Sequence, residues 1–426
     1  MLIDVSIKNY LSFKDEVVFS LKATSGKKDD DSNVLSLSND IDILKTSAIY
    51  WYNASWKTNL LKAIALIKIL IVDSWNLGPN TPFFSLWKIP FQPFWLNIKT
   101  RNEPAEFKIN FEIDGILYRY EFSLDWFKIY SEILYCRKTQ KEKILFKREF
   151  QKIKIYDFED NNSISRVNEN NLALSVFAKE WSLEAKKIHK FFQEIYIFTD
   201  KWNTQDSEIM MLNEYETFKP FLKSLLYRAD LWITDIDFSI KEMPFNQLPK
   251  SEDLRLKLQS QWIVVPENIE SRIWSSYHNV FDEAGNVVWK HAFGIQDESN
   301  WTVKILNLAW SIYNVIRQWK ILFIDEIDAS LHSLLLLNLI RSFNRANTQS
   351  HYQIVFTTQN THIMDIKKTL RRDQIWFVEK DKFWISTLSR LSDKNIRKEY
   401  LSEKNYYNKR FWWLDNIKER DDLLNE

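Results

Sequence analysis

The eight residues Trp51–Thr58, which read WYNASWKT, decide the fold of this chain. With glycine in place of its two tryptophans, the stretch becomes G-x-x-x-x-G-K-T, a phosphate-binding loop whose backbone amides surround the phosphates. Such a loop follows a strand and opens a helix. Thr46–Tyr50 can form a buried strand and Asn59–Leu66 has helical spacing, so the loop would lie at a helix N-terminus, which favours anions. The stretch therefore predicts an α/β nucleotide-binding fold if both tryptophans stand for glycine.

Glycine and tryptophan occur in unusual numbers. The 426 residues include 5 glycines and 19 tryptophans, whereas average glycine usage, about 7%, would give roughly 30 glycines in a chain of this length. Together the two residue types come close to an ordinary glycine share, which indicates that one stands for the other. We hypothesise that many UGA codons, which the source organism reads as glycine, are translated here as tryptophan.

The positions of the tryptophans bear on this hypothesis. Ser74–Asn76, Lys201–Thr204 and Phe411–Asp415 each place tryptophan in a turn context, where glycine supplies a positive φ without steric cost. Trp376, by contrast, lies in the apolar run Gln374–Val378, where an aromatic residue belongs. The alternative is a chain that is truly rich in tryptophan. An indole at a left-handed position of the loop would then cost about 1–2 kcal/mol and block the phosphates.

A second stretch places two acids at the end of an apolar strand. Lys320–Ile324 leads directly into Asp325 and Glu326. This has the form of a Walker B strand, in which the first acid positions Mg²⁺ and the second polarises the attacking water as general base. In the phosphate loop, Lys57 would reach the β and γ oxygens and Thr58 would hold Mg²⁺ through its hydroxyl. The two stretches together predict binding of ATP and Mg²⁺.

At this point the sequence resembles a known family. Five segments, in order along the chain, are similar to those of the bacterial AAA/ABC-type ATPases grouped with abortive-infection and overcoming-lysogenization-defect proteins, which are relatives of the RecF and SMC heads. The five segments are Asn53–Asn59, Glu298–Thr302, Asp325–His332, Phe356–Thr361 and Arg371–Asp381. The resemblance implies an α/β P-loop NTPase of the ABC/SMC-head type that is split in sequence, with an antiparallel β segment and a helical insertion.

The resemblance also implies roles for individual residues. Ser299–Thr302 would be the signature segment, which contacts the γ-phosphate bound to the opposite subunit. The residues expected to bind ATP are Trp51, Asn53, Ala54, Ser55, Trp56, Lys57, Thr58, Asn59, Ser299 and Trp301. The residues expected to hold Mg²⁺ are Thr58 and Asp325, and those expected to act in catalysis are Glu326, Lys57 and Gln359.

Some positions depart from the family's pattern. The family commonly has glycine at five positions that are all tryptophan here, namely 51, 56, 301, 310 and 319. This coincidence supports the recoding hypothesis. The family usually has histidine where Gln359 stands; glutamine can orient water or contact a γ-phosphate, but it cannot carry a proton. His362, three residues on, is an alternative, and a structural role for that histidine stays open.

The pattern of strands and helices predicts four stretches. Residues 1–75 would form the N-terminal part of the ATPase domain with the phosphate loop, and residues 76–178 a β-rich segment with a hairpin at Asp114-Gly115. Residues 179–286 would form a helical or variable insertion. Residues 287–426 would return to alternating strands and helices and complete the nucleotide-binding sheet with the signature, Walker B and switch segments.

Charge and composition exclude several classes of protein. With 58 Lys+Arg against 57 Asp+Glu, the chain does not coat nucleic acid by bulk charge. A single cysteine, Cys136, excludes a disulfide framework and a multi-cysteine zinc site. No apolar run of about 18 residues and no signal-peptide pattern is present, so we expect no membrane contact and a cytoplasmic location. A local basic cluster (Lys367, Lys368, Arg371, Arg372) leaves nucleic acid open as a partner.

Two classes of function remain. The first is an ATP-hydrolysing homodimer that acts as a switch or motor; the resemblance implies a role in phage defence or DNA transactions, together with a separate effector protein. The second is a non-hydrolysing interaction module, which is favoured if Trp51 and Trp56 are genuine, because the loop could then hardly accept phosphates.

Overall fold

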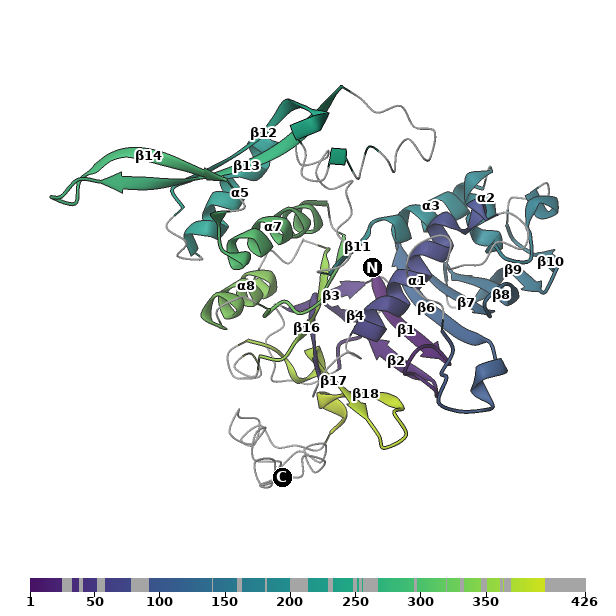
Figure 1. Cartoon of the computed structure of the whole chain (residues 1–426). Coiled ribbons are helices and arrows are strands. Elements are labelled where there is room, and N and C mark those ends of the chain that lie inside the picture. Colours follow the sequence, from purple (N-terminus) through teal and green to yellow (C-terminus); the bar gives the residue numbers. More distant parts are fainter. Residues whose placement is uncertain are drawn as a thin grey trace, which may run out of the picture. The chain divides into compact units, whose positions relative to one another are not determined.

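The computed structural model consists of two compact units, Met1–Asn203 with Asn314–Glu426, and Thr204–Tyr313 (Figure 1). It describes residues 1–24, 33–37, 41–51, 58–77, 92–139, 141–158, 163–180, 182–199, 214–228, 233–247, 251–252, 255, 267–294, 297–318, 320–329, 333–345, 351–360, 363 and 369–394. Among these residues, no helix combines the length and apolar character needed to cross a membrane.

The first unit contains a six-stranded sheet that carries the two predicted stretches. The strands, in spatial order, are β11 (Ile195–Phe198), β15 (Ile321–Ile324), β16 (Gln353–Thr358), β5 (Thr46–Trp51), β17 (Ile375–Lys380) and β18 (Ser386–Arg390). All neighbouring pairs are parallel except β17 with β18. Every residue of β15 and β16 is buried, as expected for central strands covered on both faces. The predicted strands before the phosphate loop and before the acidic pair are therefore confirmed. They lie in the same sheet, with β16 between them.

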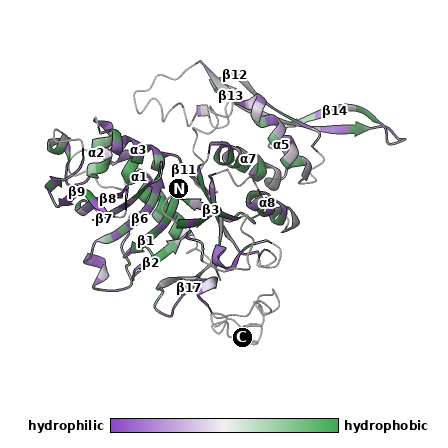
Figure 2. Ribbon diagram, turned by 180° about the vertical axis from the view of Figure 1, so that it is seen from behind, coloured by the Kyte–Doolittle hydropathy of each residue, from purple (hydrophilic) through white to green (hydrophobic). Residues whose placement is uncertain are grey.

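Helix α1 (Thr58–Asp73) follows β5 and buries ten of its sixteen residues. Figure 2 shows this helix mainly in green, the colour of hydrophobic residues, as expected for a helix that is mostly buried. It packs against α2 (Ala173–Lys179) and α3 (Leu183–Gln193), and its apolar residues belong to the main core of this unit. Helix α8 (Ser333–Arg345) connects β15 to β16 along the chain.

A seven-stranded antiparallel sheet forms the second layer of strands in this unit. In spatial order its strands are β10 (Lys152–Ile155), β9 (Lys143–Glu149), β8 (Ile129–Arg137), β7 (Ile116–Leu124), β6 (Ala105–Ile113), β1 (Leu2–Lys8) and β2 (Val17–Ser20). Asp114 and Gly115 join β6 to β7 with φ angles of 50° and 78°, the pair of positive values that a tight hairpin turn requires. The predicted hairpin is confirmed. A separate two-stranded sheet pairs β3 (Val34–Leu37) with β4 (Ile41–Leu44).

The second unit differs from the predicted helical insertion. It contains α5 (Tyr215–Arg228) and the first part of α7 (Asn300–Gln318), but between them lies a three-stranded antiparallel sheet. Its strands are β12 (Asp235–Pro244), β13 (Asn268–Phe281) and β14 (Val287–Gly294), of which β13 and β14 form a long hairpin (Figure 1). The ladder of ten residue pairs between β12 and β13 pairs the backbones of the two strands. Strand β14 likewise belongs to this sheet and not to the nucleotide-binding sheet.

Short 3₁₀ segments complete the described elements: Ser74–Asn76, Thr100–Asn102, Ser163–Arg166, Phe245–Gln247, Arg372–Gln374 and Leu391–Asp393. The first of them corrects a prediction. Trp75 lies in the 3₁₀ turn after α1 and is not among the residues with positive φ, so its backbone does not require glycine. The other two predicted tryptophan turns, Lys201–Thr204 and Phe411–Asp415, lie outside the described residues.

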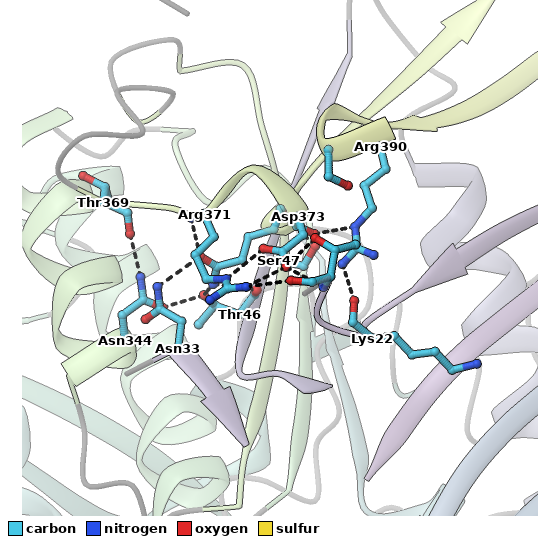
Figure 3. A network of polar contacts seen from close by, with 12 residues as sticks. Lys22, Asn33, Thr46, Ser47, Asn344, Thr369, Arg371, Asp373 and Arg390 are labelled. Atoms are coloured by element: carbon cyan, nitrogen blue, oxygen red, sulfur yellow. Dashed lines mark hydrogen bonds and ion pairs between the residues drawn. The ribbon is translucent and has the colours of Figure 1, made fainter. Parts of the chain in front are cut away.

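A buried polar network fastens the beginning of β5 to its neighbours (Figure 3). Thr46 Oγ1 donates to Oδ1 of Asn344 on α8 over 2.6 Å and accepts from Nε2 of Gln374 over 2.6 Å. Ser47 Oγ donates to the carbonyl oxygen of Gln374 over 2.9 Å. Because these bonds lie at the amino ends of the parallel strands, they fix β5 at the edge opposite to the phosphate loop.

The two arginines that left nucleic acid open as a partner both bond within the protein. Arg371 is only 5% exposed, and its Nε contacts Oδ1 of Asp373 over 3.0 Å. Arg372 Nη2 donates to the carbonyl oxygen of Lys394 over 2.7 Å. Since a buried carboxylate such as that of Asp373 needs a cationic partner, Arg371 serves the fold. Binding of nucleic acid by this chain stays a prediction. Lys367 and Lys368 lie outside the described residues.

Candidate nucleotide-binding site

The candidate site lies at the edge of the six-stranded sheet where the parallel strands end. Strand β5 ends at Trp51, and α1 begins at Thr58, which is the last position of the predicted phosphate loop. Thr58 Oγ1 donates a hydrogen bond of 2.9 Å to Oδ2 of Asp325, which follows the last residue of β15. Two residues separated by 267 positions along the chain are thus in direct contact.

The carboxylate of Asp325 is held from two sides. Its Oδ2 accepts from Thr58, and its Oδ1 accepts from Oγ1 of Thr357, near the end of β16, over 2.7 Å. The backbone N–H of Asp325 donates to the carbonyl oxygen of Phe198, the last residue of β11, over 2.8 Å. Strands on both sides of β15 therefore fix the position of this half-buried side chain.

Glu326 has a backbone conformation that is rare for a residue with a side chain. Its φ is 48°, in the left-handed region that costs about 1–2 kcal/mol for an L-residue. Two hydrogen bonds hold this turn: the N–H of Glu326 donates to Oγ1 of Thr357 over 2.7 Å, and its carbonyl oxygen accepts from the N–H of Ala329 over 2.9 Å. Strained residues of this kind concentrate at functional sites.

The segment after β16 contacts the turn after β15. Gln359 is exposed, and its backbone N–H donates to Oδ2 of Asp328 over 3.0 Å. The N–H of Ile327 donates to the carbonyl oxygen of Thr357 over 3.1 Å. The structure thus brings Gln359 beside the acidic turn, while His362 lies outside the described residues.

Asn59, predicted to bind ATP, has its side chain buried in the protein. Its exposed fraction is 2%, and its Nδ2 donates to Oγ of Ser12 over 2.9 Å. The carbonyl oxygen of Ser12 accepts in turn from the N–H of Ser386 on β18. Asn59 therefore ties the start of α1 to the turn that follows β1, and its contact with a nucleotide stays a prediction.

The signature serine belongs to the second unit. Ser299 caps the N-terminus of α7: its Oγ accepts from the N–H of Thr302 over 3.1 Å and lies 2.9 Å from Oγ1 of the same residue. The preceding residue, Glu298, accepts hydrogen bonds from Ser276 and from His278 Nε2 on β13. Although burial alone would raise the pKa of Glu298, these hydrogen bonds hold it below its usual range. Ser299 is exposed at the start of the helix that it caps.

The remaining predicted residues are not placed. Those that lie outside the described residues are Asn53, Ala54, Ser55, Trp56 and Lys57, and the side chains of Trp51 and Trp301 lie outside them as well.

The residues present fit a magnesium ion of the phosphate-bound kind. Within the described part of the chain, no group of three or more His, Cys, Asp or Glu side chains forms a metal site. The hydroxyl of Thr58 and the carboxylate of Asp325, 2.9 Å apart, offer two hard oxygen ligands. This number suits Mg²⁺, which binds through one or two protein oxygens, substrate phosphates and water.

Sequence reasoning missed Thr357 and Asp328. Both are polar residues in segments that were singled out for other residues, and neither residue type has a fixed motif position by which the contact could be found. The available signal was topological, because the residues at the carboxyl ends of neighbouring parallel strands meet at one edge of a sheet.

This mainly parallel sheet, with helix α1 beginning at Thr58 after β5 and an acidic pair at the end of β15, defines an α/β P-loop NTPase domain. A family model described as "AAA domain, putative AbiEii toxin, Type IV TA system" matches residues 52–365, and the chain belongs to this family. A comparison with curated proteins gives no match.

Three solved SMC head structures are similar to this chain. The SMC head domain from Thermotoga maritima is 13% identical, with a TM-score of 0.39 over 91% of this chain and 98% of that one. A Pyrococcus furiosus Smc head domain with an extended coiled coil, bound to the C-terminal domain of ScpA, is 13% identical, with a TM-score of 0.40 over 92% and 97%. An SmcHead bound to the C-winged helix domain of ScpA is 12% identical, with a TM-score of 0.42 over 91% and 96%.

Proposed function

We propose that this protein binds ATP with Mg²⁺ and hydrolyses it, and that positions 51 and 56 are glycine in the protein as its host makes it. The observation that carries the proposal is the contact of Thr58 with Asp325, 2.9 Å long, beside Glu326. This contact supports the proposal because a P-loop ATPase needs the last residue of its phosphate loop beside the acidic strand.

In this proposal each residue has one task. Thr58 and Asp325 would hold Mg²⁺, which would supply positive charge beside the phosphates, and Lys57 would neutralise charge on the same phosphates. Glu326 accepts a proton from the attacking water. Gln359 orients that water or contacts the γ-phosphate through hydrogen bonds. Backbone amides of residues 51–58 surround the phosphates, which requires that no side chain fill the loop.

A hairpin at another place in the chain supports the glycine assignment. The loops Asp282–Asn286 and Asp381–Ile385 have the same hydrogen bonds. In each, the backbone N–H of the aspartate at the first position donates to the carbonyl oxygen of the fifth residue, and the aspartate Oδ1 accepts from the N–H of the third and the fifth residue. In both loops the N–H of the fourth residue donates to the carbonyl oxygen of the first. The two loops are therefore one type of turn built from different sequences.

The fourth residue of this turn needs a left-handed backbone. It is Gly285 in one loop, with a φ of 84°, and Trp384 in the other, with a φ of 68°. A tryptophan thus occupies a position at which the same turn elsewhere in the chain uses glycine. An unpaired indole nitrogen does not separate tryptophans that stand for glycine from genuine ones. The buried Nε1 atoms of Trp310 and Trp376 both lack a partner within the described residues, although only position 310 is expected to be glycine.

We further propose that the protein acts as a homodimeric switch or motor, with Ser299 of one subunit contacting the nucleotide of the other. The support is the family resemblance and the exposed position of Ser299 at the start of α7. A role in phage defence or DNA transactions, carried out through a separate effector protein, follows from the same resemblance.

ATP turnover by the purified protein tests the proposal. The version with glycine at 51, 56, 301, 310 and 319 should hydrolyse ATP in the presence of Mg²⁺, whereas the tryptophan version should not bind it. Replacing Glu326 by Gln in the glycine version should lower kcat by at least about 100-fold and leave ATP binding intact, because only the general base is lost. Turnover that is unchanged in Glu326→Gln contradicts the role of Glu326, and absence of ATP binding by the glycine version contradicts the proposal as a whole.

The second candidate, a non-hydrolysing interaction module, is favoured if Trp51 and Trp56 are genuine. The codons decide between the two: UGA at both positions agrees with an ATPase, and UGG at both agrees with the module.

A further inference from the structure

Thr357 is the residue before the last of β16, and none of its surface is exposed. Its Oγ1 makes two hydrogen bonds to consecutive residues of the acidic turn. It donates to Oδ1 of Asp325 over 2.7 Å and accepts from the N–H of Glu326 over 2.7 Å. Because a hydroxyl has only one proton, the bond to Asp325 commits that proton and leaves the lone pairs for Glu326.

The backbone of Thr357 adds a third contact, since its carbonyl oxygen accepts from the N–H of Ile327. A single residue of the neighbouring strand therefore contacts three consecutive residues of the turn. The left-handed φ of Glu326 persists only if its surroundings hold it there. Without the hydroxyl of Thr357, the N–H of Glu326 would lose its partner, and the turn could relax toward an ordinary negative φ and carry the glutamate side chain with it.

We propose that Thr357 is a positioning residue that sets two carboxylates with one hydroxyl: the metal ligand through Asp325 and the general base through the backbone of Glu326. The inference rests on the proposed ATPase function, because Thr357 acts only through Asp325 and Glu326, whose roles that function assigns. Serine at this position keeps the hydroxyl, and valine keeps the shape without it. The pair of variants separates the hydrogen bonds from the packing.

Thr46 provides a matched control. It is also fully buried, and its Oγ1 likewise donates one hydrogen bond and accepts another, to Asn344 and from Gln374 (Figure 3). On the paired strands, Thr46 lies opposite Ile354, three residues before Thr357, which is about 10 Å along the strand. Valine at position 46 therefore leaves a similar set of buried polar groups unpaired at the other edge of the sheet.

The experiment compares Thr357→Val, Thr357→Ser and Thr46→Val in the protein with glycine at 51, 56, 301, 310 and 319. Steady-state kinetics give kcat, KM for ATP and the Mg²⁺ concentration for half-maximal rate, and thermal unfolding gives stability. For Thr357→Val we expect kcat to fall about 10- to 100-fold, the Mg²⁺ requirement to rise several-fold and KM for ATP to stay within about threefold, because second-layer partners of a metal ligand have effects of this size. Thr357→Ser should restore kcat to within about threefold of the parent.

Thr46→Val should lose stability as Thr357→Val does but keep the parent kcat within about threefold. The inference is overturned if Thr357→Val keeps the parent kcat, if Thr357→Ser is as slow as Thr357→Val, or if Thr46→Val is equally slow. Should Thr357→Val fail to fold, Thr357→Cys, which keeps a weak S–H donor, replaces it with the same expected order of rates. An inactive parent would overturn the proposed function and this inference together, and it is recognised because every variant then lacks turnover.

Discussion

At the scale of the residue, a left-handed backbone costs free energy wherever glycine is replaced by a residue with a side chain. Trp384 has such a backbone in the loop between β17 and β18, and its side chain is 53% exposed. Trp376 lies in β17, the first strand of the same hairpin, with an ordinary extended backbone, and is 5% exposed. Substitution by glycine should therefore change the stability of the protein differently at these two positions.

Replacing each of these tryptophans by glycine gives opposite expectations. Trp384→Gly should leave the free energy of unfolding unchanged or raise it by up to about 1 kcal/mol, because relief of the left-handed strain offsets the exposed contact with Lys380. Trp376→Gly should lower it by about 3–5 kcal/mol, because a buried aromatic side chain leaves a cavity. Chemical denaturation measures both. A loss of more than about 1 kcal/mol in Trp384→Gly would show that position 384 favours tryptophan.

At the scale of the element, the turn that leads into β17 contains the buried charge of Asp373. Burial alone would raise the pKa of Asp373, but hydrogen bonds and the charges of Arg371 and Arg390 hold it below its ordinary value. A carboxylate with a depressed pKa in the folded state stabilises the fold above its unfolded pKa, about 3.9, and this contribution is lost as the pH falls through the folded value.

The pH dependence of Asp373→Asn follows from this sign. At pH 7 the variant should be less stable than the parent by about 2–4 kcal/mol, because Arg371 loses its ion pair and the nearby charge of Arg390 is no longer balanced by the carboxylate. The difference in free energy of unfolding should shrink as the pH falls below about 4, because the unfolded parent then takes up a proton at Asp373 that the folded parent takes up only at a lower pH. Denaturation curves at several pH values measure it. A difference that stays constant down to pH 3 would contradict the account of this network.

The elements that carry the site could be predicted from the sequence because their signals are local and strong. β15 is a continuous apolar run, β16 contains the apolar run 354–356, and α1 has an apolar helical repeat from its first turn. The three-stranded sheet of the second unit was missed although Ile236, Phe238 and Ile240 alternate with polar residues in β12. That alternation is short and lies between helical segments, and only pairing with β13 along ten positions makes it a strand.

The contacts of Thr357 and Asn59 could not be predicted, because each depends on a partner far along the chain. Thr357 lies 32 positions from Asp325, and Asn59 lies 47 positions from Ser12. The residue types alone agree equally well with an exposed role. Arg371 is the opposite case: its basic neighbours favoured a surface contact, and the buried Asp373 two positions on was the signal that opposed it.

At the scale of the whole molecule, the proposed dimer depends on bound nucleotide. In the glycine version with Glu326→Gln, ATP should persist in the site, and the mass in solution should double when Mg²⁺ and ATP are added. Light scattering after size exclusion measures this change. Adding Ser299→Ala should weaken the dimer and leave ATP binding by each subunit within about threefold, since Ser299 is assigned to the partner's nucleotide. A mass that does not respond to ATP would contradict the dimeric switch without affecting the ATP-binding assignment.

The identity of residues 51 and 56 in the host's own protein tests the central claim most directly. Trypsin cleaves after Lys45 and Lys57, so a single peptide, Thr46–Lys57, contains both positions. Fragmentation of this peptide by mass spectrometry should assign glycine to each of them. Tryptophan at either position would contradict the phosphate-binding loop and with it the ATPase.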